Sequence, residues 1–267
     1  MLHDVWLKRL EGRKFCSINV ADDIYLGAFL VSGGILPQKT SAENPTQNQG
    51  VGPAGRIVFY DIVPLTVQTA NVAALQAQTA NVPLVLAAGV GATLGVAPDG
   101  SQATVIQFDV PRAVSFTSVS NLSGSNITVV GFDYFGRKQT QKRAGPNNNT
   151  VNTLKAFASV LSITSDTTSA STMSVGSSDI YGLPWVVSDL GYVQDVGWAG
   201  ALARDAGTAV VADATNPATN ATGDVRGTYL PTSASNGARR LVFALALSTA
   251  QAGYNATPAA VVGVTPA

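Results

Sequence analysis

The sequence contains few charged residues, although many enzymes and most nucleic-acid-binding proteins need them. Charged residues make up 12% of the 267 residues, and 16 Lys and Arg balance 16 Asp and Glu. A neutral chain exerts no general attraction on nucleic acid or on an anionic membrane. A typical soluble domain carries about 25% charged residues, so much of this surface is expected to be buried against partners. We expect an assembly protein with no nucleic-acid or membrane partner.

Cysteine, histidine and glutamate are almost absent. The single cysteine, Cys16, excludes a disulfide within the chain. The single histidine, His3, removes Ser-His and Cys-His nucleophilic systems and histidine-based zinc sites. Apart from the adjacent Asp22 and Asp23, the aspartates stand singly. The sequence therefore predicts a protein that is not an enzyme, with no catalytic, cofactor-binding or metal-binding residues; a lysine- or carboxylate-based enzyme is the weakest alternative.

Long apolar runs are also missing. No run approaches the length of about 18 residues that marks a transmembrane helix. The first 15 residues carry charges throughout and lack the apolar centre of a secretory signal. We expect neither a membrane span nor secretion.

From residue 56 onward the chain is rich in short runs of Val, Ile, Thr and Phe. Their spacing of about 8–12 residues is typical of a sandwich or barrel. The predicted fold is all-β, with a β-sandwich or jelly-roll-like body behind an N-terminal extended arm. The expected division is an arm with a short helix and linker at residues 1–56, a β-sandwich domain at 57–176, and a C-terminal β-rich region at 177–267 that is able to share the preceding core.

Residues 1–14 predict a short amphipathic helix. Leu2, Trp6 and Leu10 recur every four residues and share one helical face. So short a helix is unstable alone, so it needs this chain or a neighbour to dock on. The arm residues proposed to bind a partner are Trp6, Lys8, Arg9, Arg13 and Lys14.

The stretch "ITVVGFDYFGRKQTQ", residues 127–141, predicts a β-hairpin. Gly136 stands where the turn needs a positive φ, and the Asp133 side chain is placed to brace the turn. The densest basic cluster outside the arm follows. This cluster is either the solvated face of the hairpin or a contact with an acidic neighbouring subunit, and it consists of Arg137, Lys138, Lys142 and Arg143.

Three segments give less regular patterns. Pro111 is expected to break residues 103–120 into two strands. Residues 68–81 predict either a helix or a long loop. The small, uncharged residues at the end of the sequence predict extended chain.

Two stretches resemble virion proteins of tailed bacteriophages. The first carries "FDVPRAVSFTS", "SGSNITVVGFDYFGR", "FASVLSIT" and a closing "SVG", and resembles a β-sandwich module of such proteins. The second carries "TGDVRGTY" and "NGARRL", which are similar to segments that follow this module. Together the matches cover roughly residues 100–247, and the arm lies outside them.

The resemblance implies a non-enzymatic virion component, foremost a capsid decoration or cement protein. Such proteins commonly form homotrimers that bind across neighbouring major capsid subunits on the capsid surface, after synthesis in the host cytoplasm. One alternative is a tail adaptor, tail tube subunit or fibre base. Another is a receptor- or glycan-binding module that would use Trp185, Trp198 and the loop at residues 213–224.

Overall fold

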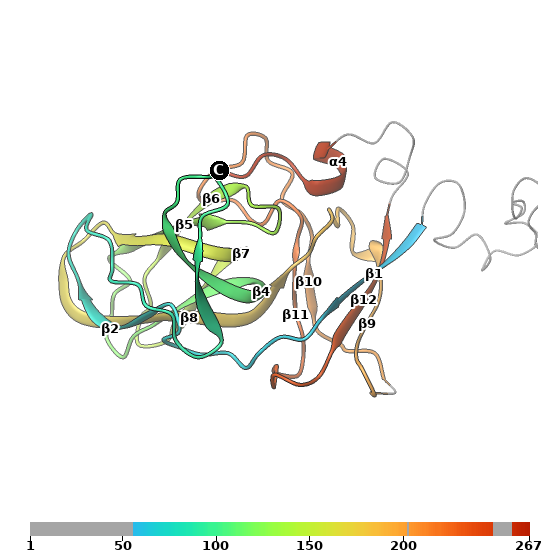
Figure 1. The fold of residues 1–267 in the computed structure, drawn as a ribbon, viewed down its shortest axis with the longest axis horizontal. Coiled ribbons are helices and arrows are strands. Elements are labelled where there is room, and N and C mark those ends of the chain that lie inside the picture. The colour runs from blue at the N-terminus through green and yellow to red at the C-terminus, as the bar shows by residue number, and fades with distance from the viewer. Residues whose placement is uncertain (1–55, 202, 248–257) are drawn as a thin grey trace, which may run out of the picture. The chain divides into compact units, whose positions relative to one another are not determined.

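The computed structural model describes residues 56–201, 203–247 and 258–267. Of these residues, 49% lie in strands and 4% are helical, so the all-β prediction is confirmed. Curled antiparallel sheets make up the fold (Figure 1). The strands are β1 (Arg56–Ile62), β2 (Ala73–Gln78), β3 (Ala92–Val96), β4 (Thr104–Thr117), β5 (Asn126–Phe132), β6 (Lys138–Ala144), β7 (Thr150–Ser165), β8 (Ser169–Gly182), β9 (Val193–Trp198), β10 (Thr208–Val210), β11 (Thr228–Leu230) and β12 (Leu241–Leu247).

The larger sheet runs in the order β10-β11-β8-β4-β7-β5-β6, with β2 added on β8 and β3 added on β4. A smaller sheet has the order β1-β12-β9. Two short helical turns complete the described elements, a 3-10 turn η1 (Leu190–Tyr192) and the helix α4 (Pro258–Val262).

The predicted hairpin at residues 127–141 is confirmed. Strands β5 and β6 pair from Asn126–Ala144 to Phe132–Lys138 without a break in register. Successive strand residues point to opposite faces, so Gln139 and Gln141 of β6 are buried while Lys138 is exposed.

The three longest strands each change partner along their length. The first part of β4 pairs with β3, whereas its second part pairs with β8. Strand β8 pairs with β2, β4 and β11 in turn. Because of these changes of partner, a single strand belongs to more than one part of the sheet, and the sheet is curled.

Pro111 does not break the chain into two strands, contrary to our expectation. Strand β4 is continuous, and its register against β7 shifts between Gln107 and Arg112. A proline that cannot donate a ladder hydrogen bond is accommodated at such a bulge.

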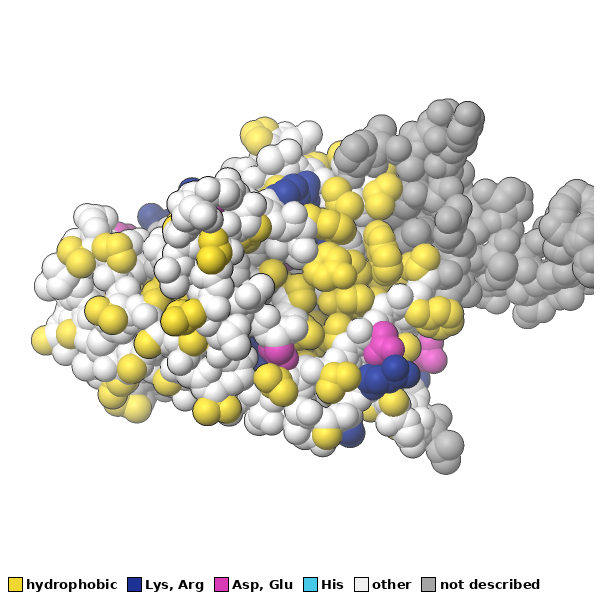
Figure 2. Space-filling view, viewed as in Figure 1, with side chains coloured by type: hydrophobic (Ala, Val, Ile, Leu, Met, Phe, Trp, Pro, Cys, Tyr) yellow, Lys and Arg dark blue, Asp and Glu magenta, His cyan; other side chains and the backbone are white. Residues whose placement is uncertain are grey.

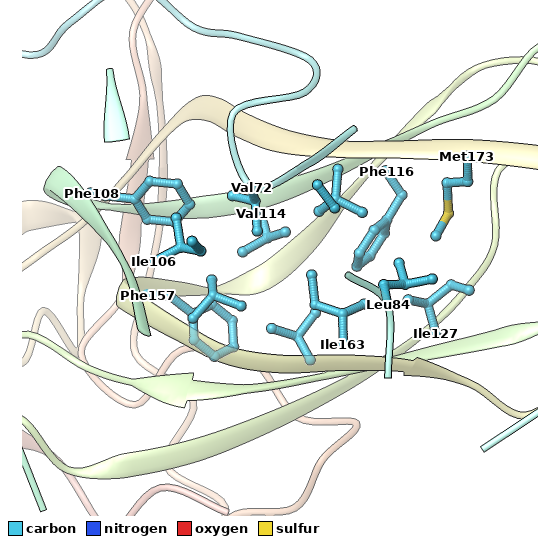
Figure 3. Packing of buried hydrophobic residues seen from close by; sticks show 14 of the residues in the cluster. Val72, Leu84, Ile106, Phe108, Val114, Phe116, Ile127, Phe157, Ile163 and Met173 are labelled. Carbon is cyan, nitrogen blue, oxygen red and sulfur yellow. The ribbon is translucent and has the colours of Figure 1, made fainter. Parts of the chain in front are cut away.

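The main core lies within the larger sheet and the segments that pack against it (Figure 3). Two of its three phenylalanines, Phe116 and Phe157, are fully buried, and Leu84 and Val72 reach the core from outside the long strands. The cluster contains Val72, Ala73, Leu84, Ile106, Phe108, Val114, Phe116, Leu122, Ile127, Val129, Phe157, Val160, Ile163, Met173 and Val175. Burial of this apolar surface is the dominant favourable contribution to folding.

Two further expectations were wrong. Residues 73–78 form strand β2 rather than a helix or loop, and they pair with β8 nearly 100 residues later in the chain. The C-terminal stretch is not wholly extended, because residues 258–262 form helix α4. The predicted N-terminal helix and arm lie outside the described residues, and the three-part division stays a prediction; strand β8 runs through its boundary at residue 176.

Candidate functional site

The turn of the β5–β6 hairpin is built around the carboxylate of Asp133. Its Oδ1 accepts hydrogen bonds from the backbone N–H groups of Phe135 and Arg137, both at 2.8 Å. The Gly136 N–H donates to the Asp133 carbonyl at 3.0 Å, and Gly136 has a φ of 75°. Both turn predictions, the aspartate brace and the positive-φ glycine, are therefore confirmed.

Two arginines complete the coordination of Asp133. Its Oδ2 lies 2.9 Å from Nη1 of Arg226 and 3.1 Å from Nε of Arg137. Asp133 and Arg226 are both buried, so this ion pair is screened little by solvent. Four hydrogen-bond donors therefore bind this one carboxylate. They hold the hairpin turn against Arg226, which lies 93 positions later in the chain than Asp133.

The same guanidinium groups hold the C-terminal segment. Arg137 donates from Nη2 to the Val262 carbonyl at 2.7 Å and from Nη1 to the Gly263 carbonyl at 3.3 Å. Arg226 also donates to the Val262 carbonyl, at 3.2 Å. The carbonyls of Val262 and Gly263 lie at the C-terminal end of α4 and have no hydrogen-bond donor within the helix. The two arginines supply these donors.

Lys155 of β7 and Asp224 belong to a second network of buried polar contacts, which reaches β6 and the loop around residue 220. The Lys155 ammonium is buried and donates to the carbonyls of Thr140 and Thr219 at 2.9 and 2.8 Å. Burial lowers the pKa of Lys155, an effect that the negative charge of Asp224 opposes. Burial likewise raises the pKa of Asp224, whose carboxylate accepts from the backbone N–H groups of Ala156 and Arg226.

Strand β6 is the last strand of the larger sheet, and its outer edge pairs with two other segments of the chain. The Thr140 N–H donates to the Ala267 carbonyl at 2.8 Å, and the Lys142 N–H donates to the Asn220 carbonyl at 2.7 Å. Unpaired edge groups invite pairing with other chains. The C-terminal segment and the loop around residue 220 therefore cover this edge.

Two aromatic side chains project from the braced turn. Tyr134 and Phe135 are 43% and 47% exposed, and their rings lie 5.1 Å apart in an edge-to-face arrangement. Tyr134 also contacts the ring of Tyr60, which in turn lies 5.5 Å from Phe243. Figure 2 shows hydrophobic side chains gathered on one face of the molecule between α4 and β1, with few charges among them. Rigidly held, partly exposed aromatic rings are typical anchors of protein interfaces.

An apolar groove of about 420 Å³ lies along the β10–β11–β8 end of the larger sheet. Its apolar walls come from different strands, with Val210 on β10, Leu230 on β11, Ile180 on β8 and Leu154 on β7. Among the lining residues that the structure describes, only Asp213 and Asp224 have ionisable side chains. An apolar hollow of this size is within the range of ligand and peptide sites.

The structure does not gather the predicted basic cluster at one place. Arg137 is committed to Asp133 and to the C-terminal segment. Lys138 and Lys142 are exposed on one face of β6, and Lys142 lies 3.9 Å from Asp166. Arg143 is half-buried. Their proposed role in partner binding stays a prediction, as does that of Trp6, Lys8, Arg9, Arg13 and Lys14, which lie outside the described residues.

The candidate glycan contacts are largely engaged within the chain. Trp198 is buried, and the Arg239 guanidinium covers its ring at 4.4 Å. Trp185 is half-buried. In the loop at residues 213–224, Asp213 accepts from the backbone N–H groups of Thr215 and Gly223, as aspartates in turn-rich loops commonly do.

Sequence reasoning missed Lys155, Asp224 and Arg226 as members of the buried polar network. A signal was present for Lys155, because it stands two residues before the core side chain Phe157 in a strand, where period-two alternation gives both the same face. Arg226 and Asp224 belong to the "TGDVRGTY" stretch, but nothing local predicts that Arg226 meets Asp133.

Comparisons with protein-family models, curated proteins and solved structures find no match for this chain. Within the described ranges, no group of three or more His, Cys, Asp or Glu side chains is arranged to hold a metal ion. That part of the chain also has no helix with the length and apolarity needed to cross a membrane.

Proposed function

We propose that this chain is a non-enzymatic structural protein of a tailed-bacteriophage virion, a capsid decoration or cement protein. In this proposal its body is a β-sandwich of jelly-roll type with an N-terminal arm. Homotrimers bind across neighbouring major capsid subunits on the outer capsid surface and stabilise the head. The protein is made in the host cytoplasm.

The observation that carries the proposal is the exposure of large apolar side chains over a surface with little charge. Val119 is 84% exposed and Phe59 is 70% exposed, and Tyr134 and Phe135 project from a rigid turn. Hydrophobic side chains that gather on one face, as between α4 and β1 in Figure 2, mark contact with other proteins. Many modest contacts, repeated around a symmetric shell, add up to strong attachment.

The resemblance of residues 100–247 to phage virion proteins supports the same proposal. The charged residues of the quoted motifs form ion pairs and hydrogen bonds within the fold. Asp109 pairs with Arg112, which also bonds the Leu65 carbonyl, and Asp133 pairs with Arg226. Such residues maintain a scaffold, which is what a structural virion protein requires.

The deciding experiment is to quantify this protein against the major capsid protein in purified particles. A decoration protein is expected in amounts comparable to the major capsid protein, and particles lacking it should break at lower temperature. A few copies per particle would instead support a tail adaptor, tail tube or fibre-base component. Absence from particles would remove both proposals.

A further inference from the structure

We infer that the apolar groove at the β10–β11–β8 end of the larger sheet receives residues 1–14 of a second copy of this chain. Leu2, Trp6 and Leu10 enter the groove, and the neighbouring cations face Asp213. The inference rests on the proposed function, because assembly on a shell brings copies side by side.

The groove has the composition of a site for an apolar helix face. Val210, Leu230 and Leu154 are 55%, 44% and 46% exposed in its lining, and Ile180 lies among them. Thr208 is opposite Leu230 in the register of β10 with β11, so the two strands present one continuous surface. Amphipathic helices bind such grooves through apolar side chains three or four residues apart.

Charge favours the same occupant. Among the described lining residues, the ionisable side chains are two carboxylates, of which Asp224 is buried and Asp213 is half-buried. The Thr215 hydroxyl and the backbone amides of Gly223 and Thr215 lower the pKa of Asp213, so this carboxylate is anionic at neutral pH. Residues 1–14 contain four cations, Lys8, Arg9, Arg13 and Lys14, against two carboxylates. A second hollow, of about 440 Å³, has both a cation, Arg204, and a carboxylate, Asp205, in its lining, so its charge does not favour a basic segment in the same way.

The length of the chain allows the segment to reach another copy. Residues 15–55 separate the segment from the first described strand residue, Arg56. At about 3.4 Å per extended residue, these residues span up to roughly 140 Å. That reach exceeds the diameter of a domain of this size, so a neighbouring copy is accessible.

The test uses full-length protein with the photoreactive amino acid p-benzoylphenylalanine in place of Trp6. This protein, with natural nitrogen, is mixed with a ¹⁵N-labelled wild-type pool, irradiated and analysed by mass spectrometry. We expect cross-links that join residue 6 of an unlabelled chain to labelled groove peptides containing residues 208–211 or 228–230. Cross-links found only within one copy, or only outside the groove, would overturn the inference.

A matched pair of variants in the labelled pool controls for general surface effects. Leu230→Lys places a cation in the groove and is expected to lower the mixed cross-link yield at least fivefold. Leu94→Lys changes a 65% exposed leucine outside the groove and should leave the yield unchanged. Equal loss in both variants, with both still folded by circular dichroism, would also overturn the inference.

The two proposals fail separately. Mixed cross-links in a protein that is absent from particles would remove the virion function and leave docking between copies. A protein abundant in particles that forms no cross-link to the groove would leave the virion function and remove the docking.

Discussion

Asp133 connects parts of the described chain that lie far apart in sequence. It joins its own turn to Arg137 and to Arg226, and both arginines bind the carbonyl of Val262. Removing one member of a buried pair leaves an uncompensated charge. The stability of the hairpin and of the C-terminal segment is therefore coupled at this residue.

We predict that Arg226→Met lowers the free energy of unfolding by about 3–5 kcal/mol, because it removes the buried one of the two arginines that pair with the buried Asp133 carboxylate. Urea denaturation measures this loss. Arg240→Met is the control, since the Arg240–Asp61 pair is exposed and such pairs contribute at most about 1 kcal/mol. Similar losses in the two variants would contradict the role given to the buried pair.

Gly136→Val is expected to lower the melting temperature by several degrees. The turn requires a φ of 75°, which is costly for a residue with a side chain, by about 1–2 kcal/mol or more. A Cβ at this position would also lie 3.1 Å from the Cβ of Pro98. Gly124→Val serves as the control, because Gly124 has open space around it and no positive φ. Unchanged melting of Gly136→Val would argue against the turn geometry.

Asp213 should make the protein sensitive to acid. Hydrogen bonds from Thr215 and Gly223 lower its pKa below the ordinary value of 3.8. The stabilisation is therefore present above pH 3.8 and is lost as the pH falls through the pKa of the folded state. We expect wild type to lose more stability than Asp213→Asn between about pH 5 and about pH 3, as measured by urea midpoints. Equal losses would show that Asp213 contributes nothing.

At the scale of elements, the C-terminal segment protects the edge of β6. Gly263 ends α4 with a φ of 84°, and its N–H donates to the Ala259 carbonyl at 3.1 Å. A Cβ at Gly263 would collide with the Val225 carbonyl. The position of the segment therefore depends on this glycine.

We predict that Gly263→Val releases the segment, uncovers the Thr140 N–H and promotes association through β6. Light scattering during storage at constant temperature measures the association. Gly100→Val is the control, because Gly100 also has a positive φ but has no atom within 4 Å of an added Cβ. Faster association of the control would contradict the edge-protection argument.

Elements set by nearby residues were predictable from the sequence, and elements set by distant partners were not. The β5–β6 hairpin was predicted down to Asp133 and Gly136, because its turn chemistry lies within a few residues. Strand β2 is polar and alanine-rich, and it is a strand because β8 pairs with it. The continuity of β4 through Pro111 likewise depends on a bulge against β7. The charged network was hidden because its members are far apart in sequence.

At the scale of the whole molecule, low charge determines how copies should associate. We predict that the purified protein is a homotrimer and that raising the salt concentration does not dissociate it. The reason is that apolar contacts are not screened by salt, whereas ion pairs between subunits are. Sedimentation equilibrium at low and high salt measures both properties. A monomer, or a trimer that dissociates in salt, would contradict the prediction.

The contacts between the β5–β6 turn and residues much later in the chain have a consequence for biosynthesis. The β5–β6 hairpin needs only residues close together, so it can form soon after it leaves the ribosome. Its arginine brace, however, comes from residue 226, and the carbonyl that both arginines bind comes from residue 262. The nascent chain must therefore hold an incomplete sheet with an uncovered edge until residues 258–267 emerge. A newly made chain is most vulnerable to chaperone capture and to mispairing during that interval.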